Sequence, residues 1–167
     1  LDTGKKSTLQ ARNGTVGPDC LAIAPLAKDF GIFTFDPGFM ATASCESRIT
    51  YIDGDAGILL YRAYPIEQLA TRSSFLEVAY LLIKGELPQR APLDSWRESI
   101  RYHTMLHEDL KRLFGAFPKD AHPMAVSAAV VAALSTFYAE DLDPNRPEQV
   151  EKSVLRLIAK FPTIVAY

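Results

Sequence analysis

The spacing of the apolar residues changes once along the chain, near residue 62, and this change limits the folds available to it. Residues 1–62 are rich in Gly, Thr, Ser and Phe and carry turn signals at short intervals, among them Asn13-Gly14 and Gly17-Pro18. Residues 63–167 instead repeat apolar side chains every three or four positions, the period of amphipathic helices. We therefore predict a mainly α protein, with a small N-terminal β-rich unit (1–62) followed by a multi-helix array (63–167).

The β-rich unit is predicted to contain an antiparallel hairpin. Short extended-looking segments cover 32–35, 47–52 and 57–62, and apolar and polar residues alternate in the second of them, as in a half-buried strand. Asp53-Gly54 lies between the last two segments, and its glycine can supply the positive φ that a tight reversal needs. The pattern therefore predicts a hairpin over 47–62.

The helical array is predicted from caps and breakers as well as from periodicity. Ser74 and Glu77 have the spacing of a capping box at the start of a helix over 75–84, which ends at Gly85. Further helices are expected over 65–70, 92–105, 107–117, 124–139 and 147–161. The Ala/Val-rich helix over 124–139 should be buried on most faces. Residues 162–167 look like the opening of another helix, so we expect the chain to be truncated.

Composition excludes several classes of protein. With 18 basic and 20 acidic residues the formal net charge is -2, which gives no long-range field for gripping a nucleic-acid backbone. The longest apolar run, over 125–134, is too short to span a bilayer. Two cysteines, Cys20 and Cys45, are too few for a disulfide framework and are typical of a reducing compartment. We expect a cytoplasmic protein that binds neither nucleic acid nor membrane.

No catalytic constellation is visible in the residues themselves. His103 and His107 are four apart and could face one metal ion from a helix, but no third ligand follows at a recognisable spacing. Neither cysteine has a cationic neighbour in the sequence that would lower its pKa. Asp53 and Asp55 are close together, but aspartates in a hairpin turn are ordinary turn chemistry.

One pattern indicates an anion site. Arg156 and Lys160 are one helical turn apart, so both cations project from the same face of a helix. A guanidinium beside an ammonium suits phosphate oxygens, and Tyr138 could add a hydroxyl or a ring for a base to stack on. The spacing leaves open a plainer alternative, a solvated basic face next to the acidic linker over 141–147.

Five segments of the chain together resemble a known family. They are Phe33-Thr-Phe-Asp-Pro-Gly-Phe39, residues 43–62, Tyr64-Pro-Ile-Glu-Gln-Leu-Ala70, Arg101-Tyr-His-Thr-Met-Leu-His107 and Ala121-His-Pro-Met-Ala-Val126. The resemblance is to citrate synthase of the Gram-negative bacterial, hexameric type, and it runs the length of the chain. One departure is Ala63, where the family usually has Gly. From this change we expect a backbone φ at Ala63 that is negative or slightly strained.

The resemblance implies a part in condensing acetyl-CoA with oxaloacetate to citrate and CoA, without a cofactor, by a protein that self-associates as a dimer or hexamer. The family's catalytic His and Asp residues belong to later segments of a chain about two and a half times this length. His103, His107 and His122 do not match those segments, so no catalytic residue is carried over. The chain by itself is predicted to be inactive.

What the resemblance carries over is regulatory. The family's Gram-negative members are inhibited by NADH away from the active site, and the matching positions here are His103, Thr104, Met105, Tyr138, Arg156 and Lys160. Tyr102 stands where the family has Arg, which predicts that NADH binds weakly or not at all. Three alternatives remain open: a 2-methylcitrate synthase using propionyl-CoA, a non-catalytic adenine-nucleotide-binding module, and a structural helical domain.

Overall fold

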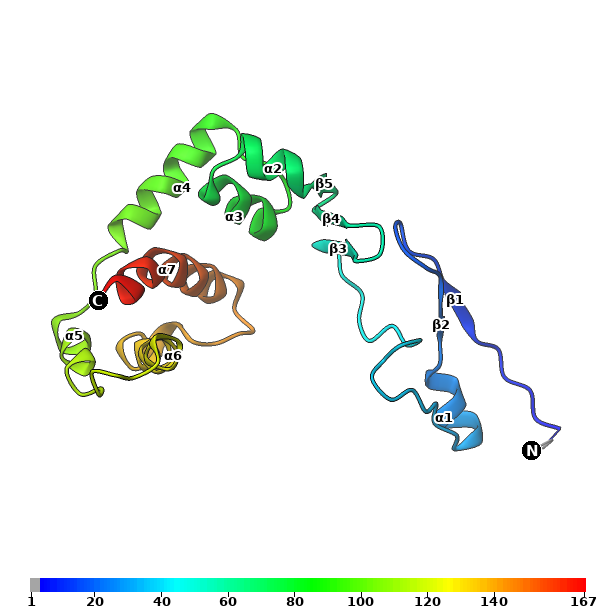
Figure 1. Cartoon of the computed structure of the whole chain (residues 1–167). Coiled ribbons are helices and arrows are strands. Elements are labelled where there is room, and N and C mark those ends of the chain that lie inside the picture. Colours follow the sequence, from blue (N-terminus) through cyan, green and yellow to red (C-terminus); the bar gives the residue numbers. More distant parts are fainter. Residues whose placement is uncertain (1–3) are drawn as a thin grey trace. The chain divides into compact units, whose positions relative to one another are not determined.

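A computed structural model describes residues 4–167 (Figure 1). The chain divides into two compact units. The first unit ends at Leu87 and the second spans Pro88–Tyr167. The predicted division at residue 62 lies inside the first unit, whose C-terminal part is already helical. The fold class is as predicted: short antiparallel strands come first, and the remainder of the chain is mainly helical.

The first unit holds two small antiparallel sheets. The strand pair lies at the N-terminal end, and a three-stranded sheet in the order β3-β4-β5 follows a short helix, α1 (Ala24–Phe30). The strands are β1 (Gln10–Arg12), β2 (Cys20–Ala22), β3 (Thr50–Asp53), β4 (Ile58–Tyr61) and β5 (Tyr64–Pro65). The β1–β2 pair was not predicted, although turn signals lie between its strands.

The predicted hairpin over 47–62 is confirmed, with one difference in its turn. Thr50 lies opposite Tyr61 and Asp53 opposite Ile58. Gly57, not Gly54, takes the positive φ, at 67°, while the Asp53 carboxylate accepts a hydrogen bond from the Ala56 N–H at 2.9 Å. Since Asp53 lies opposite Ile58, residues 54–57 form the turn, and its left-handed residue is at the end of the turn.

The extended segment predicted over 32–35 forms no strand. The alternation of apolar residues there has no partner ladder, and Phe33 and Phe35 are 83% and 92% exposed. A strand needs a neighbouring strand to satisfy its backbone N–H and C=O groups. Without such a neighbour the segment stays irregular, and the prediction was wrong.

The turn between β4 and β5 is left-handed at both of its residues. Arg62 has φ 49° and Ala63 has φ 69°, because Tyr61 pairs directly with Tyr64 and leaves only two residues for the reversal. The expectation of a negative or slightly strained φ at Ala63 is therefore corrected to a positive φ. The Arg62 guanidinium donates to the carbonyl oxygens of Arg48 at 3.2 Å and Leu82 at 2.8 Å, which ties this turn to the helix α3 (Phe75–Lys84).

The helices begin and end close to where caps and breakers predict. They are α2 (Ile66–Arg72), α3 (Phe75–Lys84), α4 (Arg90–Tyr102), α5 (Glu108–Phe114), α6 (Pro123–Leu134) and α7 (Pro147–Ala166). The capping box of α3 is confirmed: the Ser74 N–H donates to Glu77 at 2.7 Å, and the Glu77 N–H donates to the Ser74 hydroxyl at 3.4 Å. Gly85 closes α3 with φ 96°.

The prediction of a buried helix over 124–139 was wrong in its length and its burial. This helix ends at Leu134, and two 3-10 turns follow it, η1 (Ser135–Phe137) and η2 (Ala139–Asp141). It is also buried along one stripe only, since Met124, Ala128 and Ala132 are exposed. An Ala/Val-rich sequence shows that a helix can be buried but not that enough neighbours surround it.

Pro162 does not start a new helix, because α7 continues through it. A proline inside a helix removes one backbone hydrogen bond and usually kinks or ends the helix. Here tertiary contacts hold the last turn in place: Ile164 is 3% exposed, and the Thr163 hydroxyl donates to the Thr104 carbonyl at 3.0 Å. Packing therefore outweighs the local preference.

The core of the second unit joins α5, α6 and α7. Its buried members are Leu106, Leu110, Val130, Leu134 and Ile164. Figure 1 shows these three helices grouped together, with the α4–α5 connection beside the C-terminal end of α7. Burying Leu106 and Ile164 in the same cluster places residues 103–106 against the last turns of α7. No helix within residues 4–167 has the length and apolar content needed to cross a membrane.

Candidate functional site

The six residues predicted to bind an effector lie around the C-terminal half of α7. The Lys160 ammonium donates to the carbonyl oxygen of His103 at 2.8 Å and also to that of Met105. Between those two carbonyls, the Thr104 carbonyl accepts from Thr163. Three consecutive carbonyls of the α4–α5 connection are thus held by side chains of α7. The backbone of 103–105, rather than its side chains, faces Lys160.

Lys160 is a buried charge with only 4% of its surface exposed. A buried ammonium is tolerated only when hydrogen bonds replace its lost hydration. It has three N–H donors, and two of them are taken by the carbonyls of His103 and Met105. Lys160 therefore anchors the α4–α5 connection and keeps one N–H for any further contact.

Arg156 and Lys160 do project from one face of α7, as their spacing predicts. Both approach the ring of Tyr138, with Arg156 Cζ 4.2 Å and Lys160 Nζ 5.7 Å from its centroid. These are cation–π distances. The Arg156 side chain is 18% exposed and Lys160 only 4%, while the Nη1 atom of Arg156 is itself buried.

Asp141 belongs to this cluster, and sequence reasoning missed it. Its Oδ2 lies 2.8 Å from Arg156 Nη1, and its Oδ1 lies 3.3 Å from Lys152 Nζ. The hydrogen bond from Arg156 lowers the pKa of the Asp141 carboxyl, with a further contribution from Lys152, while desolvation opposes them. Fifteen positions separate Asp141 from Arg156, so no local spacing rule pairs them.

The side chains of His103 and His107 serve as helix caps. His103 follows the last residue of α4, and its Nδ1 lies 2.9 Å from the Ser99 carbonyl oxygen. His107 precedes α5 and accepts a hydrogen bond from the Asp109 N–H at 3.1 Å. Because α4 ends at Tyr102, the two histidines do not share a helix face as their spacing suggested. Residues 4–167 contain no cluster of three or more His, Cys, Asp or Glu residues that could hold a metal ion.

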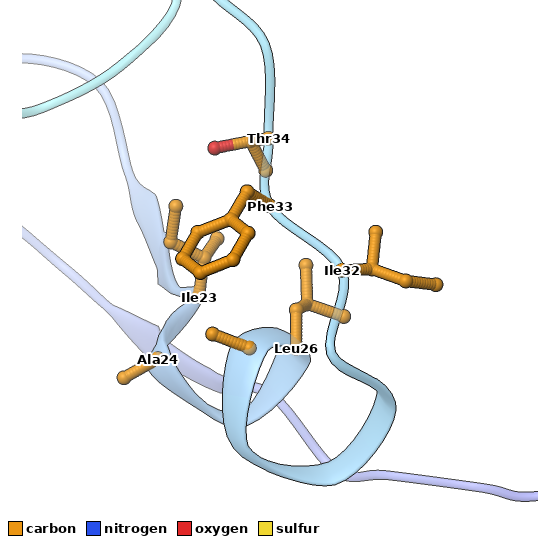
Figure 2. Close-up of a pocket in the computed structure, with 7 residues that line it drawn as sticks. Ile23, Ala24, Leu26, Ile32, Phe33 and Thr34 are labelled. Atoms are coloured by element: carbon orange, nitrogen blue, oxygen red, sulfur yellow. The ribbon is translucent and has the colours of Figure 1, made fainter.

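A separate surface pocket lies in the first unit and is mainly apolar. It has a volume of about 240 Å³ and is lined by α1 and the segment after it. The side chains of Ile23, Leu26 and Phe33 lie close together there, while that of Ile32 extends away from them (Figure 2). Thr34 provides a hydroxyl at its edge. The pocket brings together no acid, base or nucleophile. It therefore does not supply the chemistry of an active site.

The comparisons with known proteins agree with the helical fold. The sequence profile of the family described as "Citrate synthase, C-terminal domain" matches residues 38–167. Since this match covers most of the chain, the chain belongs to the citrate synthase family.

Similar proteins are longer than this chain. "Citrate synthase 1" of Mycobacterium tuberculosis is 56% identical over 164 residues, in both strain CDC 1551 / Oshkosh and strain H37Rv. These residues are 98% of this chain but only 38% of each relative. The chain thus spans well under half the length of the curated relatives it matches.

Solved structures of the same family have the same fold over this region. The citrate synthase of Thermotoga maritima has a TM-score of 0.67 at 29% identity and covers 80% of this chain and 34% of its own. That of Pyrobaculum aerophilum has a TM-score of 0.65 at 29% identity, covering 97% and 38%. The Thermoplasma acidophilum enzyme, crystallised with carboxymethyl coenzyme A and oxaloacetate, has a TM-score of 0.69 at 22% identity, covering 79% and 35%, and supports the fold alone.

Proposed function

We propose that this chain is part of a citrate synthase, which condenses acetyl-CoA with oxaloacetate. In that reaction the acetyl methyl carbon adds to the oxaloacetate carbonyl, and water cleaves the thioester to give citrate and free CoA. The observation that carries the proposal is the 56% identity over 164 residues to "Citrate synthase 1". The helices of the second unit contribute scaffold to such an enzyme, because no residue of this chain matches the family's catalytic His and Asp residues.

The proposal is tested by following CoA release with a thiol reagent. The gene product in its natural source is compared with the 167-residue chain produced alone. Since 164 residues make up 38% of each relative, we expect a natural polypeptide of about 430 residues. It should release CoA from acetyl-CoA only when oxaloacetate is present, and the 167-residue chain should not. A preference for propionyl-CoA would instead identify the 2-methylcitrate alternative.

We further propose that the protein is cytoplasmic, self-associates as a dimer or hexamer, and is of the Gram-negative, NADH-regulated type. Exposed apolar side chains support self-association, among them Met124, Phe161 and Val165 at 65%, 45% and 58% exposure. Single exposed apolar residues are common, but several on neighbouring helices indicate an interface. Sedimentation of the natural protein tests the self-association: a monomer at micromolar concentration would contradict it.

The Tyr138–Arg156–Lys160 cluster is proposed as the effector site. A guanidinium held over an aromatic ring supports binding of a phosphate next to a stacked base. Arg156→Ala should therefore abolish saturable NADH binding, measured by calorimetry, while Arg146→Ala, in the linker before α7, should leave it unchanged. Saturable binding by a natural product that never releases CoA would favour the non-catalytic adenine-nucleotide-binding alternative.

A further inference from the structure

We propose that Asp141 is an internal competitor for Arg156, so that an anionic ligand binds this cluster by displacing a carboxylate of the chain itself. The inference rests on the proposed effector site and adds how that site is regulated. In the structure Asp141 Oδ2 lies 2.8 Å from Arg156 Nη1. This ion pair places a carboxylate oxygen beside the buried Arg156 Nη1, at the position that a phosphate oxygen would take.

A carboxylate and a phosphate compete for the same donors. Both present oxygens that match the N–H groups of a guanidinium, and both form short, charge-assisted hydrogen bonds with it. Lys152 Nζ lies 3.3 Å from the other Asp141 oxygen, so two cations converge on one carboxylate. A ligand phosphate that replaced this carboxylate would meet both cations. Without a ligand, Asp141 neutralises part of the charge that would attract one.

Arg156 is the cation of the cluster that a ligand can compete for. Lys160 is 4% exposed and its ammonium is bonded to the carbonyls of His103 and Met105, so withdrawing it would leave two backbone carbonyls without a donor. The Arg156 guanidinium lies over the Tyr138 ring at 4.2 Å, which keeps its plane in place. Exchanging its carboxylate for a phosphate therefore requires no movement of α7.

Asp141 can release Arg156 by turning its side chain alone. Its backbone stays fixed by two contacts: the Asp141 N–H donates to the Tyr138 carbonyl at 2.9 Å, and the Asp141 carbonyl accepts from the Ser153 hydroxyl at 3.1 Å. An aspartate has only two side-chain torsions, and rotation about the first of them, χ1, moves the carboxylate between staggered positions. The exchange is therefore local.

The test is a calorimetric titration of the full chain with NADH at low ionic strength, in the unmodified protein and in three variants. Asp141→Asn keeps the shape of the side chain but removes its charge, and should tighten binding about tenfold. Asp143→Asn is the matched control, because Asp143 lies in the same linker but pairs with Arg146 at 3.4 Å, and should leave binding unchanged. Arg156→Gln should abolish binding.

The outcomes separate the two proposals. Equal affinities for the unmodified chain and Asp141→Asn, with loss in Arg156→Gln, would overturn the competition and retain the effector site. An equal gain in Asp143→Asn would show a general charge effect and would also overturn it. No binding in any protein, Asp141→Asn included, would overturn both.

A measurement on the unmodified chain keeps the proposal testable if Asp141→Asn fails to fold. Carbon NMR of the Asp141 carboxyl reports its pKa directly. Because Arg156 lowers that pKa in the free protein, saturating NADH should raise it toward its usual range. An unchanged Asp141 pKa at saturation would contradict displacement, and failure to saturate would contradict the effector site.

Discussion

At the scale of single residues, the most unusual backbone lies at Arg62 and Ala63, the left-handed pair between β4 and β5. A side chain on a residue with positive φ crowds the following carbonyl oxygen, and only glycine avoids this cost. The chain tolerates the conformation because the Arg62 guanidinium donates to the carbonyls of Arg48 and Leu82. Tertiary hydrogen bonds thus support a turn that the local sequence disfavours.

Ala63→Gly should therefore stabilise the protein. Removing the Cβ at φ 69° relieves the left-handed strain, and the greater freedom of glycine in the unfolded chain offsets part of the gain, which leaves about 0.5–1 kcal/mol. Urea unfolding measures the difference in free energy. Ala70→Gly, inside α2, is the control and should lose about 1 kcal/mol. A loss of stability in Ala63→Gly would show that the turn is not strained.

Lys160→Met should destabilise the second unit, although it replaces a charge with an apolar side chain of similar length. The carbonyls of His103 and Met105 would lose a shared donor, at a cost of about 1–3 kcal/mol. Lys152→Met, at a position 59% exposed, should change the free energy of unfolding very little. If both variants unfolded at the same urea concentration, the anchoring role of Lys160 would be excluded.

At the scale of elements, the capped ends of α3 follow the sequence more closely than the uncapped end of α6 and the interior of α7 do. The start of α3 at Ser74 and its end at Gly85 agree with the prediction, because a cap depends on residues three or four positions apart. The continuation of α7 through Pro162 and the early end of α6 at Leu134 disagree with it. Those two outcomes depend on neighbours that are distant in sequence.

Ser74→Ala tests the cap at the start of α3. The hydroxyl accepts from the Glu77 N–H and donates to the Glu77 carboxylate at 2.6 Å, and its removal should cost about 1 kcal/mol. Ser74→Thr keeps the acceptor and should stay near the wild-type value. Circular dichroism during thermal unfolding measures both variants. An unchanged midpoint for Ser74→Ala would mean that packing alone fixes the start of α3.

At the scale of the whole molecule, acid should destabilise both units. The pKa of Asp36 is lowered by the Thr42 side chain and by the Ala41 N–H, that of Glu108 by Lys111, and that of Asp141 by Arg156. A carboxyl with a lowered pKa in the folded state binds fewer protons than it does unfolded, so stability rises with pH. The contribution is present above the ordinary values of 3.8 and 4.5 and is lost as pH falls below them.

The thermal midpoint should therefore be constant between about pH 5.5 and 7 and fall below about pH 4.5. Arg156→Gln removes one cause of the shift at Asp141, so its midpoint should vary less with acid than that of the unmodified chain. Arg146→Gln is the matched control and should retain the full dependence. Identical curves for the unmodified chain and Arg156→Gln would contradict the assignment of the Asp141 pKa to Arg156.

The sequence by itself determined the mainly α class, the β3–β4 hairpin, the caps of α3 and the family, because each depends on local patterns or on motifs read residue by residue. It also placed Arg156 and Lys160 on one face of a helix, since helical spacing fixes both directions. Only the tertiary structure decided which groups these side chains bind. Lys160 binds the carbonyls of His103 and Met105 across more than fifty positions, and Asp141 reaches Arg156 from the preceding linker. Such pairings arise from packing of the core, which brings distant segments together in ways that no local spacing encodes.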